Sequence, residues 1–350
     1  MNKPLTKNKA YLWVKTNLFS TPFNSALTLI LALLLAKILW GLVDWGILTS
    51  VWTGDADACR QADGACWAFL REKTMYILFG HYPFEEQWRP QMFVGSFFLL
   101  ALLSQFKRFW SKALVYAWVF VALMSGLGML GGVFGVPYVE MESWGGLPLT
   151  LSLAFLGILL SYPIGIALAL GRRSELPILR MLCVVFIEVI RGVPLISLLF
   201  MSSVMLPLFL PEGVTISKVL RAQIAIIFFA SAYMAEVVRG GLQSLPKGQY
   251  EAADTLGLSY FKKMIFVILP QALKAVIAPT VNTFIGLFKD TSLVFIIALS
   301  DLMFTTQASL KDTDWLGFTV EGYLFAALVY FVFCYFISFS SSRLEQELKT

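Results

Sequence analysis

Charged side chains are scarce in this 350-residue sequence, of which Asp, Glu, Lys and Arg make up only 14%. Soluble globular proteins carry about 25% charged residues. Hydrophobic residues reach 58% of the chain instead. The scarcity of charge excludes an ordinary soluble domain. It predicts an all-α polytopic membrane protein, because an apolar chain crosses a bilayer as helices.

Histidine is rarer still, since His81 is the only one, and it lies outside the apolar segments. Its isolation excludes a nucleophile–histidine pair in the membrane interior and a metal site built from several histidines. The phosphate-binding pattern G-x4-G-K-[ST] does not occur in the sequence. We therefore expect no catalytic residue, no metal and no cofactor in this chain, so that any ATP and Mg²⁺ would be used by a partner. The net charge of +5 does not indicate nucleic-acid binding, because the basic residues gather at the ends of apolar segments.

Eight apolar segments qualify as membrane spans, for which a helix needs about 20 residues. They are 24–46, 91–106, 113–136, 147–170, 178–210, 219–238, 268–289 and 320–341. The segment 178–210 is too long for one straight crossing, so we expect it to be tilted or broken. The apolar segment 293–303 is too short to cross and is typical of a re-entrant or interfacial piece.

The basic residues predict how these spans are oriented. They concentrate in the segments 1–20, 107–112, 172–180, 239–274 and 343–349, which alternate with segments poorer in Lys and Arg. Cytoplasmic segments carry the excess of basic residues. Both termini are therefore predicted to be cytoplasmic, with residues 1–20 as a tail, and the loop 47–90 is predicted to be periplasmic.

Two of the four cysteines, Cys59 and Cys66, lie in this predicted periplasmic loop. An oxidising compartment permits a disulfide between them, and two free thiols are the alternative, since spacing alone does not give the Cα distance. Cys183 and Cys334 lie in apolar segments and are typical of small core residues.

A change of composition near Glu140 divides the chain into two regions. Residues 21–140 hold three predicted helices rich in Trp and Phe, and residues 141–350 hold five predicted helices with more Gly, Pro and small polar residues. The longest polar run of the second region, within the predicted cytoplasmic loop 239–267, contains Glu251-Ala252-Ala253 and then Gly257. Helix formers precede Gly257, which can close a helix in the left-handed conformation, and Ser259 can cap the next one. The run predicts two short helices joined by a bend.

This run, with its flanks RGGLQSLPKGQ and LGLS, resembles the signature loop of ABC importer permeases, and specifically their polar amino-acid branch, the histidine and glutamine permeases. The resemblance implies that the loop docks into a groove of an ATPase subunit and passes on its movement. An ordinary amphipathic connector is the alternative. The residues that the resemblance assigns to coupling are Glu251, Ala252, Ala253, Asp254, Gly257 and Ser259.

Two further motifs are candidates for the substrate path. Glu188 and Arg191 are spaced to pair on one helix, directly before a break at Gly192 and Pro194. Charges at this depth are costly and usually functional, and a broken helix frees backbone groups for a ligand. A structural ion pair that supports the kink is the alternative, and Glu236 and Arg239 repeat the same spacing near the cytoplasmic face.

The second motif ends the seventh span and resembles the N-x3-G-x2-K-D-T-S pattern of the same permeases. It offers a cation, an anion and hydroxyl groups where the helix is expected to break, which suits an amino acid with one carboxylate and one ammonium group. A helix C-terminus capped by a lysine is the alternative. The residues are Asn282, Lys289, Asp290, Thr291 and Ser292.

Five helices with the loop between the third and fourth resemble the minimal permease core, and the three preceding helices resemble those of the longer permease subunit of general L-amino-acid importers. The resemblance implies a permease subunit of a bacterial inner-membrane importer for polar L-amino acids. It implies as partners a dimer of ATPase subunits, a second identical or homologous permease, a periplasmic amino-acid-binding protein and the lipid bilayer. An ion-coupled secondary transporter that works without an ATPase is the alternative, with Glu188 and Lys37 as its titratable groups.

Overall fold

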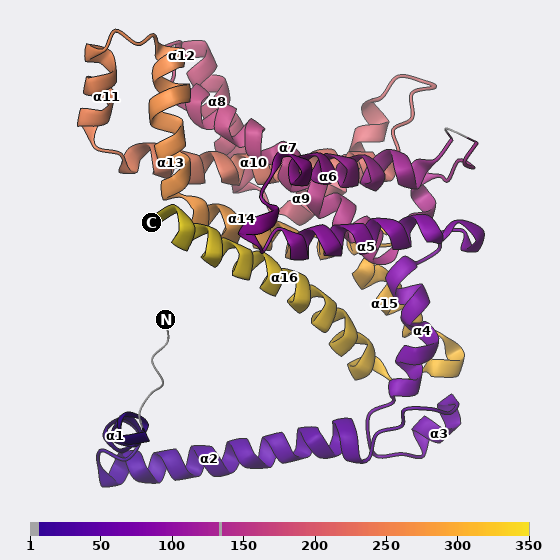
Figure 1. Ribbon diagram of the computed structural model, residues 1–350. Helices are drawn as coiled ribbons and strands as arrows, with labels where there is room; N and C mark the ends of the chain where they lie inside the picture. The colour runs from indigo at the N-terminus through magenta and orange to yellow at the C-terminus, as the bar shows by residue number, and fades with distance from the viewer. Residues whose placement is uncertain (1–6, 133–134, 350) are drawn as a thin grey trace. The chain divides into compact units, whose positions relative to one another are not determined.

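The computed structural model describes residues 7–132 and 135–349, and within these ranges the fold is helical with no β-strand (Figure 1). Five of the described helices are long and apolar enough to cross a membrane, and a bent pair of helices would add a sixth crossing. The predicted all-α polytopic fold is confirmed. The chain divides into two compact units, one made of residues up to 72 with 313–321, the other of residues 73–312 with those from 322 onward.

The first unit holds α1 (Lys7–Asn17), α2 (Pro22–Val43), α3 (Ala56–Arg60) and the start of α4 (Trp67–Phe79). Cys59 and Cys66 form a disulfide, with their Cα atoms 5.5 Å apart. The Cys66 amide donates to Glu321 Oε1 at 2.9 Å, which fixes the bridged loop to the first turn of the last helix. α2, the first predicted span, has no residue buried within the chain, as expected of a helix whose surroundings are lipid or a partner.

The second unit is built on two 27-residue helices, α7 (Gly146–Arg172) and α10 (Lys218–Ser244). Small residues recur every fourth position of α7, at Gly157, Ser161, Gly165 and Ala169, and each is buried. This spacing puts them on one helix face, where they allow close approach of a neighbouring helix. A Cβ added at Gly165 would lie 2.6 Å from Met234 Cβ of α10, so the two backbones meet there directly.

The second unit contains further helices. They are α5 (Trp88–Leu103), α6 (Lys112–Leu123), α8 (Pro177–Gly192), α9 (Leu195–Phe200), α11 (Lys247–Thr255), α12 (Tyr260–Lys262), α13 (Leu269–Ala275), α14 (Ile277–Asp290), α15 (Leu302–Ser309) and α16 (Thr319–Lys349). α16 begins in the first unit and continues through the second.

Two of the eight predicted spans have different bounds in the structure. α5 has the predicted 16 residues but lies three residues nearer the N-terminus than the predicted span 91–106. α6 continues as a π-helical turn to Gly128 and ends before the predicted residue 136. Gly131 and Gly132 have φ angles of +68° and +78°, which a helix does not accommodate, and part of the predicted end lies outside the described residues.

The long segment 178–210 is broken, as predicted. α8 ends at Gly192, Val193 is extended, and α9 starts after Pro194, so that the two helical parts meet at 102°. Proline disfavours the helical conformation in the residue before it, which places the break at Val193.

The span predicted at 268–289 is shifted toward the C-terminus. The membrane-length helical run is Ile277–Ile297, formed by α14 and a 3-10 helix over Thr291–Ile297. Pro279 has no amide hydrogen to donate to the carbonyl of Ala275, and the preceding run of α12 and α13 ends there. The first half of the predicted short piece 293–303 therefore belongs to this crossing.

After Ala298, which has a φ of +52°, the buried Asp301 caps α15. Its carboxylate accepts hydrogen bonds from the amides of Phe304 at 3.0 Å and Met303 at 3.2 Å. Burial raises the pKa of the Asp301 carboxyl to about 7, although these backbone donors act in the opposite direction.

Candidate functional site

The loop around Glu251 forms a bent pair of helices, as predicted. α11 ends at Thr255, and Gly257, with φ +67°, closes it through hydrogen bonds from its own amide to Asp254 O and from the Leu258 amide to Ala253 O. In Figure 1, α11 stands beside the continuous helical run of α12 and α13. The loop is shorter than the predicted 239–267, because α10 extends to Ser244 and the second helix runs on to Ala275.

One face of α11 is fixed to the rest of the unit. Ala253 is 2% exposed, and the Tyr250 hydroxyl donates to the carbonyl of Leu242 at 2.9 Å. Lys263 pairs with Asp254 at 2.5 Å across the bend. Tyr250 packs against a core cluster that includes Ala169 of α7, Ile187 of α8 and Met234 of α10. Tyr250 therefore connects α11 to side chains of α7, α8 and α10.

The opposite face of the loop is open. Glu251, Ala252 and Ser259 are exposed, and so are two large apolar side chains, Leu256 at 76% and Phe261 at 74%. Exposed apolar side chains beside charged ones are typical of a surface that contacts a partner. Ser259 occupies the N-cap position of α12 but its hydroxyl makes no capping hydrogen bond, so the prediction that it caps this helix is wrong.

Behind the loop, five charged side chains from three helices meet around Glu236. Its carboxylate contacts Arg172 of α7 at 2.5 Å and Arg239 at 2.7 Å, and Arg191 of α8 lies at 3.5 Å. Glu188 pairs with Arg172 at 3.1 Å. We call these five residues the Glu236 cluster. With three guanidinium groups and two carboxylates it keeps one positive charge in excess.

The predicted pair of Glu236 and Arg239 is confirmed, but the predicted pair of Glu188 and Arg191 is wrong. Glu188 contacts α7 and Arg191 contacts α10, because the packing of three helices offers each a nearer partner than its own helix does. Arg172, which contacts both carboxylates, was missed as a member of the site. Its position at the end of a predicted span was the available signal, but only tertiary packing reveals its partners.

Arg191 contacts an aromatic residue that lines a cavity. Its guanidinium lies 5.4 Å from the ring centre of Tyr233, and Tyr233 lines a cavity of about 280 Å³ together with Asp290 of α14. Phe229, Ala230, Thr283, Gly286 and Leu287 complete the lining. The cavity thus has the Asp290 carboxylate in its wall, and the Arg191 guanidinium lies against the ring of Tyr233. Phe229 and Tyr233 were not predicted, since aromatic residues in a span are usually ordinary packing.

The other residues of the second motif point elsewhere. Lys289 and Ser292 line a separate cavity of about 390 Å³ with Tyr323 and Tyr330 of α16. The hydroxyls of Thr291 and Ser292 donate to the carbonyls of Phe288 and Lys289, which satisfies groups left open at the end of α14. Asn282 is exposed, and so are Gly192 and Pro194 at the break after α8.

A third cavity of about 640 Å³ lies near the N-terminal ends of α7 and α10, away from the Glu236 cluster. It carries two carboxylates, Glu140 and Glu142, and two basic groups, Lys218 and Arg221. Mixed charges of this kind suit a zwitterionic solute or a charged protein surface. The first cavity is lined by α10 and α14, the second mainly by the end of α14 and by α16, and the third by the start of α10 with neighbouring loops.

Comparison with known proteins gives this geometry its context. The inner membrane amino-acid ABC transporter permease protein YhdY of Escherichia coli strain K12 is 48% identical to this chain, over 99% of this chain and 96% of that protein. The glutamate/glutamine/aspartate/asparagine transport system permease protein BztC of Rhodobacter capsulatus is 36% identical, over 99% of this chain and 95% of that protein. The chain is also similar to a solved structure described as an amino acid ABC transporter with histidines, with 32% identity and a TM-score of 0.51 over 57% of this chain and 90% of that one.

The family model described as "binding-protein-dependent transport system inner membrane component" matches residues 161–350, which include α11, the Glu236 cluster and all of α14. Members of this family are multi-pass membrane permeases that work with an ATPase in a separate subunit and with a substrate-binding protein. The family match, together with relatives that align over nearly the whole chain, establishes that this protein belongs to the permease subunits of ABC importers.

Proposed function

We propose that this permease subunit passes polar L-amino acids through the bacterial inner membrane after a periplasmic amino-acid-binding protein delivers them. The observation that carries the substrate class is the 48% identity over 99% of the chain to an amino-acid ABC transporter permease. We also propose that both termini are cytoplasmic. The concentration of basic residues at 107–112, 172–180 and 239–274 supports this orientation.

The coupling role of α11 rests on its two faces. The exposed face with Glu251, Leu256 and Phe261 would contact a dimer of ATPase subunits, which hydrolyse the ATP with Mg²⁺ and leave this chain without a cofactor of its own. The attached face, through Tyr250 and Ala253, would carry the movement of the ATPase to α7, α8 and α10. A second permease, identical or homologous, would complete the path on the other side.

The cavity beside Tyr233 is our candidate for the substrate site. Its Asp290 carboxylate suits the ammonium group of an amino acid, and the excess positive charge of the Glu236 cluster suits the carboxylate. Arg191 and Lys289 are the basic residues of the two predicted motifs. Arg191 is favoured as the partner of the substrate carboxylate, because Lys289 lines a different cavity. The helix break at Gly192 and Pro194 supports this choice, since it ends α8 directly beyond Arg191.

The proposal is tested with the complete transporter in liposomes, supplied with its binding protein and a panel of amino acids. Glutamate, glutamine, aspartate and other polar amino acids should stimulate ATP hydrolysis, whereas leucine or a sugar should not. Arg191→Gln should weaken this stimulation while Lys289→Gln leaves it unchanged. Stimulation by no member of the panel would refute the substrate class.

A further inference from the structure

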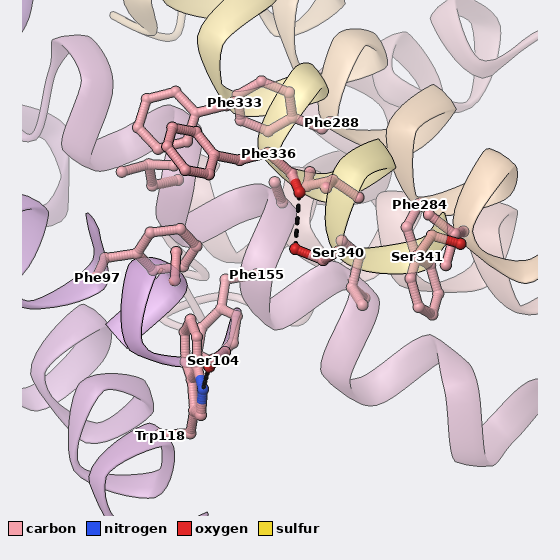
Figure 2. A pocket seen from close by; sticks show the side chains of 16 residues that line it. Phe97, Ser104, Trp118, Phe155, Phe284, Phe288, Phe333, Phe336, Ser340 and Ser341 are labelled. Atoms are coloured by element: carbon pink, nitrogen blue, oxygen red, sulfur yellow. Dashed lines mark hydrogen bonds between the residues drawn. The ribbon is translucent and has the colours of Figure 1, made fainter. Parts of the chain in front are cut away.

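An apolar cavity in the second unit lies between the extra helices and the permease core. Its volume is about 290 Å³, and its walls come from α5 and α6 on one side and from α7, α14 and α16 on the other. Figure 2 shows the rings of Phe288, Phe333 and Phe336 along one wall and those of Trp118 and Phe155 along another. Ring contacts of 5.3 to 6.3 Å link Phe97, Trp118, Phe155 and Phe333 around it.

Water does not suit this cavity. Apart from three serines and the indole of Trp118, the lining is hydrocarbon, and the Trp118 Nε1 already donates to Ser104 Oγ at 3.0 Å. A buried water needs two to four polar partners, and the hydroxyls of Ser104 and Ser340 already donate to the carbonyls of Leu100 and Phe336. Leaving the space empty would forfeit the dispersion contacts of at least five aromatic rings. An apolar chain is the occupant that such walls favour.

The hydroxyl-bearing end of the cavity is bordered by basic residues. Ser104 follows the last turn of α5, and the next residue, Gln105, donates to Ser340 of α16. Arg343 donates to Gln105 O at 3.0 Å. The exposed side chains of Lys107, Arg108 and Lys112 follow in the connection from α5 to α6. The sequence holds no acidic residue from 87 to 139, so this connection is strongly positive.

Trp110, in the same connection, indicates how deep in the bilayer the hydroxyl-bearing end of the cavity lies. Its exposed ring donates through Nε1 to the carbonyl of Ser104 at 2.9 Å. Tryptophan is enriched at the boundary between the hydrocarbon and the lipid headgroups. The basic residues therefore lie at headgroup level, and the cavity lies in the hydrocarbon directly below them.

We propose that this cavity binds one acyl chain of an anionic phospholipid, whose phosphate lies against Arg108, Lys112 and Arg343. At 290 Å³ the space lies at the lower limit of ligand pockets, so it holds part of one chain and leaves the rest of the lipid in the bilayer. The lipid fills the seam between α5–α6 and the core. This inference does not depend on which solute the transporter carries.

The occupant is tested by native mass spectrometry of the purified chain with phosphatidylglycerol or phosphatidylethanolamine of identical acyl chains. The parent should retain one phosphatidylglycerol in preference to phosphatidylethanolamine. Ala101→Phe puts a ring into the cavity and should abolish this retention, whereas Ala113→Phe, on the exposed side of α6, should not. Equal retention of both lipids by the parent, or unchanged retention in Ala101→Phe, would overturn the proposal.

The headgroup contact has its own control. Arg108→Gln should weaken phosphatidylglycerol binding about fivefold and leave phosphatidylethanolamine binding unchanged, since each basic residue near an anionic headgroup contributes about that factor. Arg180→Gln removes the same charge from the start of α8, away from the cavity, and should have no effect. An equal loss in both variants would show general attraction to anionic lipid and would contradict a specific site.

Discussion

The two sides of α7 pack by opposite rules. Toward α10 it presents Gly157, Ser161, Gly165 and Ala169, and the two helices touch so closely that a Cβ at Gly165 would clash with Met234. Toward α5 and α6 it presents Leu151, Ala154, Phe155 and Ile158, which line a cavity of about 290 Å³. The first side is close-packed, and the second leaves room for a lipid chain.

The difference shows how one helix serves two environments. A close-packed interface has few alternative arrangements, so it transmits a displacement from α11 and the Glu236 cluster as a rigid body. A seam filled by a mobile acyl chain lets the extra helices stay attached while the core moves. The close-packed side should therefore tolerate substitutions poorly, and the cavity side should tolerate them well.

The largest effect on stability is expected at the Glu236 cluster, which joins α7, α8 and α10 on the close-packed side. Glu236→Gln leaves three arginines without their central carboxylate and should lower stability by about 3 kcal/mol. Glu188→Gln, at a carboxylate that is 55% exposed and has one partner, should cost less than about 1 kcal/mol. Thermal unfolding in detergent measures both losses of stability. Equal losses would show that Glu236 contributes no more to the cluster than Glu188 does.

The next effect compares the interfaces on the two sides of α7. Gly165→Leu forces a side chain into Met234 and should cost about 1–3 kcal/mol or prevent insertion. Ala101→Leu adds the same kind of side chain at the cavity and should cost less than about 1 kcal/mol. If the two variants unfold at the same temperature, the distinction between a tight and an open side is wrong.

A smaller change in stability is expected at the bend after α11. Gly257→Val places a β-branched residue at φ +67°, which costs about 1–2 kcal/mol, although its Cβ would meet no other atom. Amino-acid uptake should nevertheless be largely lost, because the displaced α11 no longer moves the tight side. Gly257→Asn, which tolerates this conformation, should retain uptake. Normal uptake by the valine variant would remove the bend from the coupling route.

The smallest effect concerns the N-terminal end of α7, where the buried Asp301 caps α15. Since the folded-state pKa is about 7 and the ordinary value is 3.8, the folded protein keeps a proton that the unfolded chain has released between these values. Stability should therefore fall as the pH rises from about 4 to about 7.

Asp301→Asn should remove most of this slope and keep the cap, because asparagine is also a good N-cap residue. The same change at the exposed N-cap Asp55 of α3 should leave the slope in place. Melting temperatures of the parent and both variants across this pH range decide the matter. A slope that survives in Asp301→Asn would assign it to other groups.

Local signals in the sequence predicted much of the fold. The break after Gly192, the helices on both sides of Gly257 and the pairing of Glu236 with Arg239 each depend on residues close in sequence, where proline, glycine and helix spacing act. Hydrophobic length located most spans for the same reason. It failed near residue 276, where Pro279 ends one helical run inside a continuous apolar segment.

The contacts between helices were beyond local reasoning. The link of Arg172 to both Glu188 and Glu236 and the separation of Asp290 from Lys289 into two cavities follow from how α7, α8, α10, α14 and α16 pack. A single sequence gives the face of a helix but not which neighbour covers it. The assignment of coupling and substrate roles to these residues stays a prediction.

The most direct test of the account is the energy source of uptake. Liposomes that contain the permease with its ATPase, and binding protein loaded with glutamine outside, should take up the amino acid only when ATP is enclosed. Imposed proton or sodium gradients should have no effect in the absence of ATP. Uptake driven by an ion gradient through the permease alone would contradict the account.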